Sequence, residues 1–140
     1  GLRVPAIGYW KGKIPKGLVT QQPAITMDWT KTFLAISQTS EHPDYPMDGV
    51  DLLPVMTGQQ QPFDRTLFWR TRDQGAVRKG TWKYFKKITR VKDCMEESEF
   101  LFDLGFDQME KTNFKEENAD MLQELKTAFE GWNNQMLKYE

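Results

Sequence analysis

The sequence is poor in cysteine, has little net charge and lacks long apolar runs, and each scarcity excludes something. Cys94 is the only cysteine, so no disulfide can form within the chain. No run approaches the roughly 18 consecutive apolar residues of a membrane-spanning helix. The net charge of −1 gives no overall attraction to nucleic acid or anionic lipid. We therefore expect neither a nucleic acid nor a membrane as a partner.

The first ten residues contain an apolar segment in which polar side chains do not alternate with apolar ones. A segment that is apolar on both faces is typical of a strand buried inside a parallel sheet. The later candidate strands form one hairpin-like cluster that offers it no parallel neighbour. We therefore expect the chain to be a piece of a larger enzyme. An unpaired apolar edge attracts other chains, so we also expect self-association through residues 4–10.

A short amphipathic helix is predicted after a turn-rich basic loop. Asp28 is a residue type suited to the N-cap, and the apolar residues that follow recur at helical spacing. Trp29, Phe33 and Ile36 would form one apolar face, and we expect the helix to end near Ser37.

Prolines divide the chain into two parts. Four of them lie between residues 40 and 64, where they interrupt any regular element. We interpret this stretch as a linker. Residues 1–64 are then the tail end of a large α/β domain plus the linker, and residues 65–140 are a separate C-terminal subdomain.

The predicted subdomain consists of four strand-sized runs and one long helix. The runs are rich in aromatic and β-branched residues and are separated by turn residues. The helix carries a broad apolar stripe, which predicts packing across one face of a sheet. The fold class is therefore α+β, with a four-stranded antiparallel sheet packed against a long C-terminal helix. The runs cover residues 66–69, 75–79, 82–88 and 99–104, and the helix covers about 118–138.

Charge is distributed unevenly in this subdomain. Residues 70–92 are strongly basic and residues 93–140 are mostly acidic, which indicates internal compensation. Two alternatives stay open. Aromatic and basic residues interleave at 82–87, as in a small single-stranded nucleic-acid-binding module. A scaffold or oligomerisation unit would share the shape of the subdomain.

Six short blocks occur in a characteristic order and spacing along nearly the whole chain. As a set they resemble the C-terminal third of the sulfatases, in the arylsulfatase-like branch of the alkaline-phosphatase-like superfamily. The resemblance implies a large N-terminal domain with a mixed sheet, followed by a smaller domain of four antiparallel strands and a helix. The blocks are Gly1-Leu2-Arg3-Val4-Pro5, Met27-Asp28-Trp29-Thr30-Lys31-Thr32, Asp48-Gly49-Val50-Asp51-Leu52, Leu67-Phe68-Trp69-Arg70, Ala76-Val77-Arg78-Lys79-Gly80-Thr81-Trp82-Lys83 and Leu101-Phe102-Asp103-Leu104.

The resemblance also implies which chemistry the chain lacks. Sulfatases hydrolyse sulfate esters with a calcium ion and a formylglycine made from a Cys/Ser-x-Pro-x-Arg motif. Cys94 is followed by Met95-Glu96-Glu97 and does not match that motif, and His42 matches no catalytic block. The nucleophile and metal ligands would then lie in a missing N-terminal sulfatase domain, which would be the partner of this chain. We expect no catalytic residue, metal ligand or cofactor here, and no activity of the chain alone.

One pair of carboxylates is a further candidate site. Asp48 and Asp51 could bind a metal as a pair, but Asp48-Gly49 is a common turn and packing is the better interpretation. Family members are typically periplasmic, secreted or lysosomal, and the sequence leaves the compartment open.

The loop at residues 70–75 is the candidate substrate site. In sulfatases the corresponding loop can reach the mouth of the active-site cleft, and a sulfated small molecule or carbohydrate brings additional anionic groups. Arg70 and Arg72 could bind such a group, while Asp73 or Gln74 could bond a sugar hydroxyl. The competing interpretation is an exposed turn with solvated charges.

Overall fold

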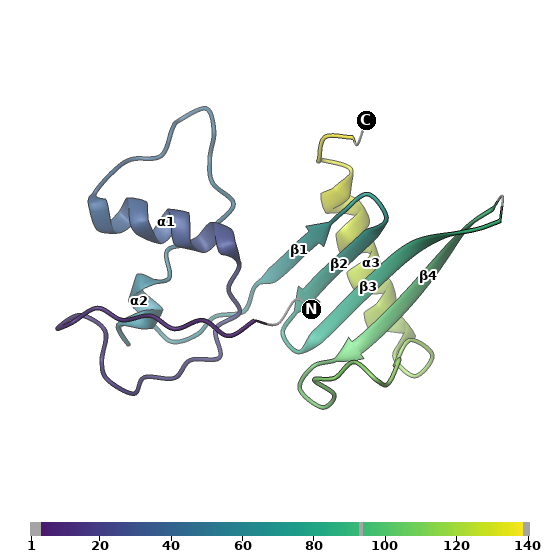
Figure 1. The fold of residues 1–140 in the computed structure, drawn as a ribbon, viewed down its shortest axis with the longest axis horizontal. Helices are drawn as coiled ribbons and strands as arrows, with labels where there is room; N and C mark the ends of the chain where they lie inside the picture. The colour runs from purple at the N-terminus through teal and green to yellow at the C-terminus, as the bar shows by residue number, and fades with distance from the viewer. Residues whose placement is uncertain (1–3, 93, 139–140) are drawn as a thin grey trace. The chain divides into compact units, whose positions relative to one another are not determined.

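The computed structural model describes residues 4–92 and 94–138. The chain forms two compact units, Gly1–Phe63 and Asp64–Glu140, and each contains its own packed elements (Figure 1). The first unit holds helices α1, Thr26–Ser37, and α2, Leu53–Met56. The second unit holds the sheet and helix α3, Ala119–Asn133.

Helix α1 begins earlier than Asp28, so the prediction that Asp28 is its N-cap was wrong. The N-cap is Ile25, and Asp28 lies in the first turn. Its Oδ2 accepts a hydrogen bond from the backbone N–H of Ile25 at 2.7 Å. A carboxylate in this position satisfies a backbone donor that the helix itself leaves unpaired. The residue type was a correct signal for a helix start, but it acts from inside the helix. The helix ends at Ser37, as predicted.

The predicted apolar face of α1 was also wrong. Phe33 is 61% exposed, whereas the two fully buried residues of this helix are Asp28 and Thr32. Their buried oxygens accept hydrogen bonds from the backbone N–H groups of Val50 and Leu52, both at 2.9 Å. These donors lie in an irregular segment with no ladder to satisfy them, so polar side chains are needed on the helix face that meets it.

Residues 4–10 form no strand, which corrects the expectation for the start of the chain. Ile7 is 96% exposed and Tyr9 82% exposed. A strand requires a hydrogen-bonded neighbour, and no described residue pairs with this segment. Gly8 lies against the side chain of Met56, where an added Cβ would approach Cε to 2.5 Å. Residues 1–3 of the first sulfatase-like block lie outside the described residues.

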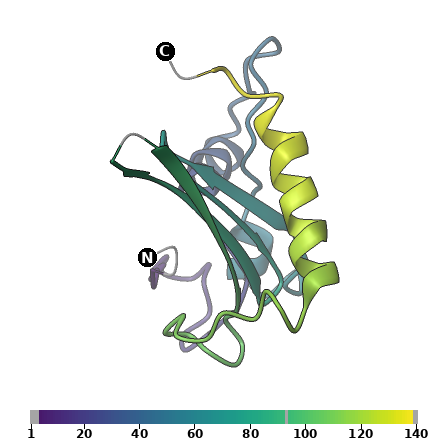
Figure 2. The same cartoon turned by 90° about the vertical axis from the view of Figure 1, so that its right-hand side faces the viewer.

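The second unit contains the predicted four-stranded antiparallel sheet. The strands are β1, Thr66–Arg70, β2, Gln74–Lys79, β3, Trp82–Val91, and β4, Cys94–Asp103, and they pair in sequence order (Figure 1). Strands β3 and β4 are longer than predicted. They continue to pair beyond the end of β2 as a two-stranded arm, from Ile88↔Glu97 to Val91↔Cys94. The arm projects from the sheet in Figures 1 and 2.

Helix α3, Ala119–Asn133, packs across one face of the sheet (Figure 2). The predicted apolar stripe is confirmed, because Leu125 and Phe129 are buried on the sheet. The helix ends earlier than predicted, at a pair of asparagines, Asn133 and Asn134. Asparagine side chains compete with the backbone for hydrogen bonds and disfavour the helix interior. The sheet side of the core is formed by Val77, Tyr84 and Leu101.

Phe129 of α3 packs directly onto the backbone of the sheet. It lies directly over Gly75 of β2, where an added Cβ would stand 2.3 Å from the Phe129 Cζ. No real side chain tolerates that separation, so the sheet needs glycine under this ring. Phe129 also contacts Trp132, which stacks on Phe68 of β1 with ring centroids 5.1 Å apart.

A polar network beside the core joins β3, β4 and α3. The buried Tyr84 hydroxyl donates to Glu99 Oε1 at 2.6 Å, and Lys126 of α3 forms an ion pair with the same carboxylate at 3.0 Å. Burial and the hydrogen bond to Glu99 both raise the pKa of Tyr84. Partial burial acts to raise the pKa of Glu99, but the hydrogen bonds from Tyr84 and Lys126 outweigh it and lower that pKa.

Ion pairs inside this unit connect the basic segment 70–92 with the acidic segment 93–140. Lys79 pairs with Glu124 of α3, Lys86 pairs with Glu97, and the buried Lys83 holds both carboxylate oxygens of Glu110 at 2.6 and 2.7 Å. The expectation of internal compensation is thereby confirmed.

We predict opposite effects from two glycine substitutions in this unit. Gly75→Ala should destabilise the protein by about 1–3 kcal/mol, because the new methyl group must displace Phe129. Gly131→Ala should stabilise it by about 0.5–1 kcal/mol, because Gly131 lies in α3 with open space around its Cα and alanine favours the helix. Urea denaturation measures both. Equal shifts in the same direction would contradict the proposed contact.

We predict that the stability cost of Tyr84→Phe depends on pH. At pH 7 the variant should lose about 1–3 kcal/mol, because the carboxylate of Glu99 loses a donor. The lowered pKa of Glu99 stabilises the fold above the ordinary glutamate value of about 4.3, and this contribution disappears as pH falls through the lower folded value. The difference between the two proteins should therefore shrink below about pH 4. Tyr45→Phe, at an exposed tyrosine, is the control and should change little at any pH.

Candidate functional site

The candidate loop is short and firmly tied to the sheet. Arg70 is the last residue of β1 and Gln74 the first of β2, so only residues 71–73 connect the strands. The N–H of Thr71 donates to the carbonyl of Gln74 at 2.8 Å, and the carbonyl of Asp73 accepts from the N–H of Ile88 at 2.8 Å. These bonds fix the loop against the neighbouring strand.

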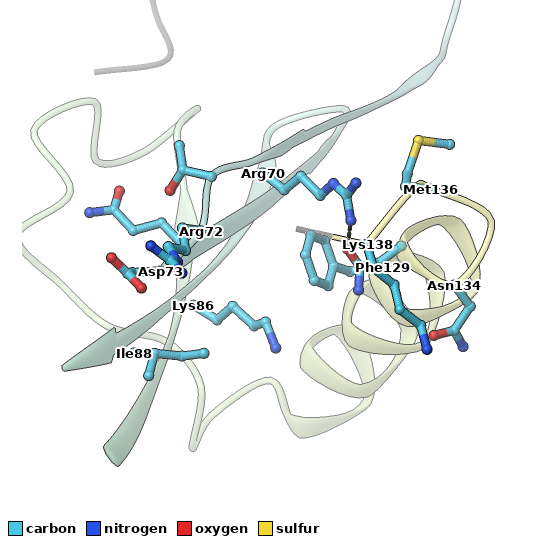
Figure 3. Close-up of a pocket in the computed structure, with 12 residues that line it drawn as sticks. Arg70, Arg72, Asp73, Lys86, Ile88, Phe129, Asn134, Met136 and Lys138 are labelled. Atoms are coloured by element: carbon cyan, nitrogen blue, oxygen red, sulfur yellow. Dashed lines mark hydrogen bonds between the residues drawn. The ribbon is translucent and has the colours of Figure 1, made fainter. Parts of the chain in front are cut away.

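All four predicted site residues line one pocket of about 330 Å³. Figure 3 shows Arg72 and Asp73 on the strand side of this pocket and Asn134 and Lys138 on the helix side. The other walls come from parts of the chain distant in sequence. These are Lys86 and Ile88 of β3, Phe129 and Asn133 of α3, and Met136 beyond its end.

The residues from β3 and α3 were missed by the sequence reasoning. One signal could have found Lys86 and Ile88, because alternation along a strand places them on the same face as the buried Tyr84. No comparable signal exists for Lys138. Its position depends on where α3 ends and how the following residues turn.

Arg70 has a structural task at this site. Its Nη1 donates to Oδ1 of Asn133 at 3.0 Å, and its Nη2 donates to the carbonyl of Leu137. The planar guanidinium thus joins the end of β1 to the last turn of α3 and to the segment after it (Figure 3). Arg70 positions the helix side of the pocket.

Lys86 is partly neutralised. Its Nζ lies 3.2 Å from Oε2 of Glu97 and 5.3 Å from the ring centroid of Phe129. These two contacts hold the ammonium group between the sheet and α3 (Figure 3).

Arg72 and Lys138 are different, because neither side chain forms an ion pair or hydrogen bond with a described residue. Both are exposed at the pocket. Among the described lining residues, Asp73 is the single acidic one against Arg70, Arg72, Lys86 and Lys138. The pocket therefore has a positive potential and free donors, which suits an anion.

The other candidates from the sequence have local roles. Asp51 accepts a hydrogen bond from the N–H of Leu53 at the start of α2, and His42 stacks near Tyr45 in a turn. Cys94 is exposed at the start of β4. Within residues 4–92 and 94–138, no three His, Cys, Asp or Glu side chains gather as a metal site would require. In the same residues, no helix is both long enough and apolar enough to cross a membrane.

The segment 82–87, which motivates the nucleic-acid alternative, is mostly buried or half-buried. Lys83 and Tyr84 are buried, the first in its pair with Glu110 and the second in the core. A stacking surface for single strands needs exposed aromatic rings beside free cations. Within this segment only Lys87 is exposed.

Known sulfatases match this chain in sequence. N-acetylgalactosamine-6-sulfatase of Canis lupus familiaris is 42% identical over 69 residues, or 49% of this chain and 13% of the relative. Arylsulfatase G of Homo sapiens is 37% identical over 68 residues, with the same coverage of both chains. Arylsulfatase A of Bos taurus is 35% identical over 89 residues, or 59% of this chain and 17% of the relative. The matched segment is thus a small part of each relative.

Solved structures share the fold over a larger part of the chain. Ps i-CgsB superposes with a TM-score of 0.68 at 22% identity, covering 89% of this chain and 27% of that one. It has also been solved in complex with k-i-k-neocarrahexaose. A Bacteroides thetaiotaomicron protein from a locus for glycosaminoglycan metabolism gives a TM-score of 0.61 at 19% identity, covering 77% and 24%. No protein-family model matches the chain.

The α+β fold with its antiparallel sheet is one found in solved sulfatases. About half of the chain is similar in sequence to sulfatases, as the six blocks predicted. The matched segment corresponds to between 13% and 17% of the length of the three curated relatives named above.

We predict that Arg70 contributes to the stability of the fold and that Arg72 does not. Arg70→Ala should lower the free energy of unfolding by about 1–3 kcal/mol, because it leaves the Asn133 side chain and the Leu137 carbonyl without their donor. Hydrogen exchange at the amides of Gln135 and Met136 should become faster. Arg72→Ala is the matched control and should change stability by less than about 0.5 kcal/mol. A large loss from Arg72→Ala would contradict this division.

Proposed function

We propose that this chain is the C-terminal third of a sulfatase whose full-length form hydrolyses sulfate esters. The observation that carries the proposal is the identity of 35–42% with N-acetylgalactosamine-6-sulfatase, arylsulfatase G and arylsulfatase A. The shared fold with Ps i-CgsB over 89% of the chain supports it independently.

In this proposal the reaction chemistry comes from an N-terminal sulfatase domain. Sulfate ester hydrolysis needs a nucleophile and a divalent cation that neutralises developing charge. The family resemblance implies formylglycine and calcium for these roles. The described residues do not fit either group, because they hold no cluster of metal ligands and the exposed Cys94 precedes Met95-Glu96-Glu97 rather than a Pro and an Arg.

The chain itself would then contribute structure and a loop that contacts substrate. Arg72 is the strongest candidate contact, because its fork of donors matches the oxygens of a sulfate and is not engaged by any described residue. Asp73 and Gln74 would bond hydroxyl groups, and Arg70 would hold the pocket in shape. The names of the relatives suggest the substrate class, a sulfated carbohydrate or other sulfated small molecule.

We predict that the 140-residue chain has no sulfatase activity. Incubation with 4-nitrophenyl sulfate, with and without added calcium, should release no nitrophenol above the blank, because we find neither the motif of the nucleophile nor a cluster of metal ligands among residues 4–92 and 94–138. Release that follows the protein peak through two purification steps would refute this assignment of roles.

The family assignment has a separate test. Sequencing the coding region that precedes the codon for Gly1 should reveal a Cys/Ser-x-Pro-x-Arg motif. A reading frame without such a motif would refute the proposal that the full-length protein is a sulfatase of this type.

A further inference from the structure

The pocket at the end of α3 is lined by two exposed cations that have no ion-pair or hydrogen-bond partner among the described residues. Arg72 comes from the β1–β2 loop and Lys138 from the segment after α3 (Figure 3). We propose that this pocket binds a second anionic group of a sulfated carbohydrate, one that is not cleaved. The choice of a carbohydrate rests on the proposed sulfatase function, whereas the anion site rests on the pocket itself.

The charges of the lining favour an anion in this pocket. Asp73 is the one described acidic residue in the lining, and Lys86 adds positive potential from the base although Glu97 partly offsets it. Arg72 would hold two oxygens of a sulfate or carboxylate in its plane, and Lys138 would add a single flexible donor. Neither residue must break a contact with a described residue to do so.

Arg70 fixes the helix side of the pocket to the sheet. Its bonds to Asn133 and to the carbonyl of Leu137 hold the segment that carries Lys138. The loop that carries Arg72 is held in turn by the bond between Asp73 and Ile88. Both sides of the pocket are thus fixed to the sheet, which reduces the entropy lost when a ligand orders the two cations.

The remaining lining suits a sugar better than a bare ion. Ile88 and Met136 offer apolar contacts for the C–H groups of a sugar ring, and the amides of Gln74 and Asn134 offer donors and acceptors for hydroxyls. A volume of about 330 Å³ lies at the small end of ligand pockets, which fits one monosaccharide unit with its sulfate.

The test is a titration of the ¹⁵N-labelled 140-residue chain with galactose 6-sulfate, followed by NMR. We expect saturable shifts confined to amides of residues 71–74, 86–88 and 133–138. Galactose and inorganic sulfate are the comparison probes, and each should bind at least about tenfold more weakly than the sulfated sugar. Equal binding of inorganic sulfate would overturn the carbohydrate part, and the absence of saturable shifts would overturn the site.

Substitutions at Arg72 and Lys138 test whether these side chains contribute to the affinity for galactose 6-sulfate. Arg72→Gln and Lys138→Gln should each weaken binding about five- to tenfold, since each removes a charge-assisted hydrogen bond. Arg72→Lys should retain part of the affinity, because the charge stays and the fork is lost. Arg90→Gln, on the arm outside the pocket, is the matched control and should leave the affinity unchanged. Unaltered binding by both Gln variants at the pocket would overturn the proposal.

The outcome is separable from the test of the sulfatase proposal. A missing upstream motif with normal binding of galactose 6-sulfate would refute the sulfatase proposal and leave the anion site standing. An upstream motif with no saturable binding would do the reverse.

Discussion

The close packing of Phe129 onto Gly75 is the contact on which the second unit depends. The ring of Phe129 occupies the space that the Cβ of any residue other than glycine would take at position 75. The helix can therefore pack directly on the backbone of β2. That approach lets Leu125 cover Val77, Tyr84 and Leu101, and it brings Trp132 onto Phe68. The pocket lies beside this contact, since Phe129 is part of its lining.

Buried polar groups hold the irregular parts of both units. In the first unit, Asp28 and Thr32 satisfy backbone donors of residues 50 and 52, which no strand or helix would pair. In the second, Glu110 reaches the buried ammonium of Lys83 from an irregular segment. Loss of Glu110 would leave the buried charge of Lys83 uncompensated, which is costly. The main effect of these contacts is therefore to specify where the irregular segments lie, and their net contribution to stability is smaller.

Two independent features of the chain bear on its function. Sequence identity relates the chain to sulfatases through a small part of their length. The pocket, by contrast, is a property of the second unit alone, formed by a loop, a strand and the end of a helix. The cations that line it differ in their contacts. Arg70 is hydrogen-bonded to α3 and Lys86 is paired with Glu97, whereas Arg72 has no partner among the described residues.

Local pattern alone determined the strands, the last helix and the candidate loop, because alternation and helical spacing report which face of an element is apolar. Tertiary structure decided the rest. The buried face of α1 is polar because the segment that meets it needs acceptors. Arg70 of β1 binds Asn133 in the last turn of α3, a contact between residues far apart in the sequence. The pocket unites residues more than 60 positions apart in sequence, such as Arg70 and Asn133, and no local pattern records that proximity. Likewise residues 4–10 are apolar enough for a strand, but a strand forms only where a neighbour supplies its hydrogen bonds.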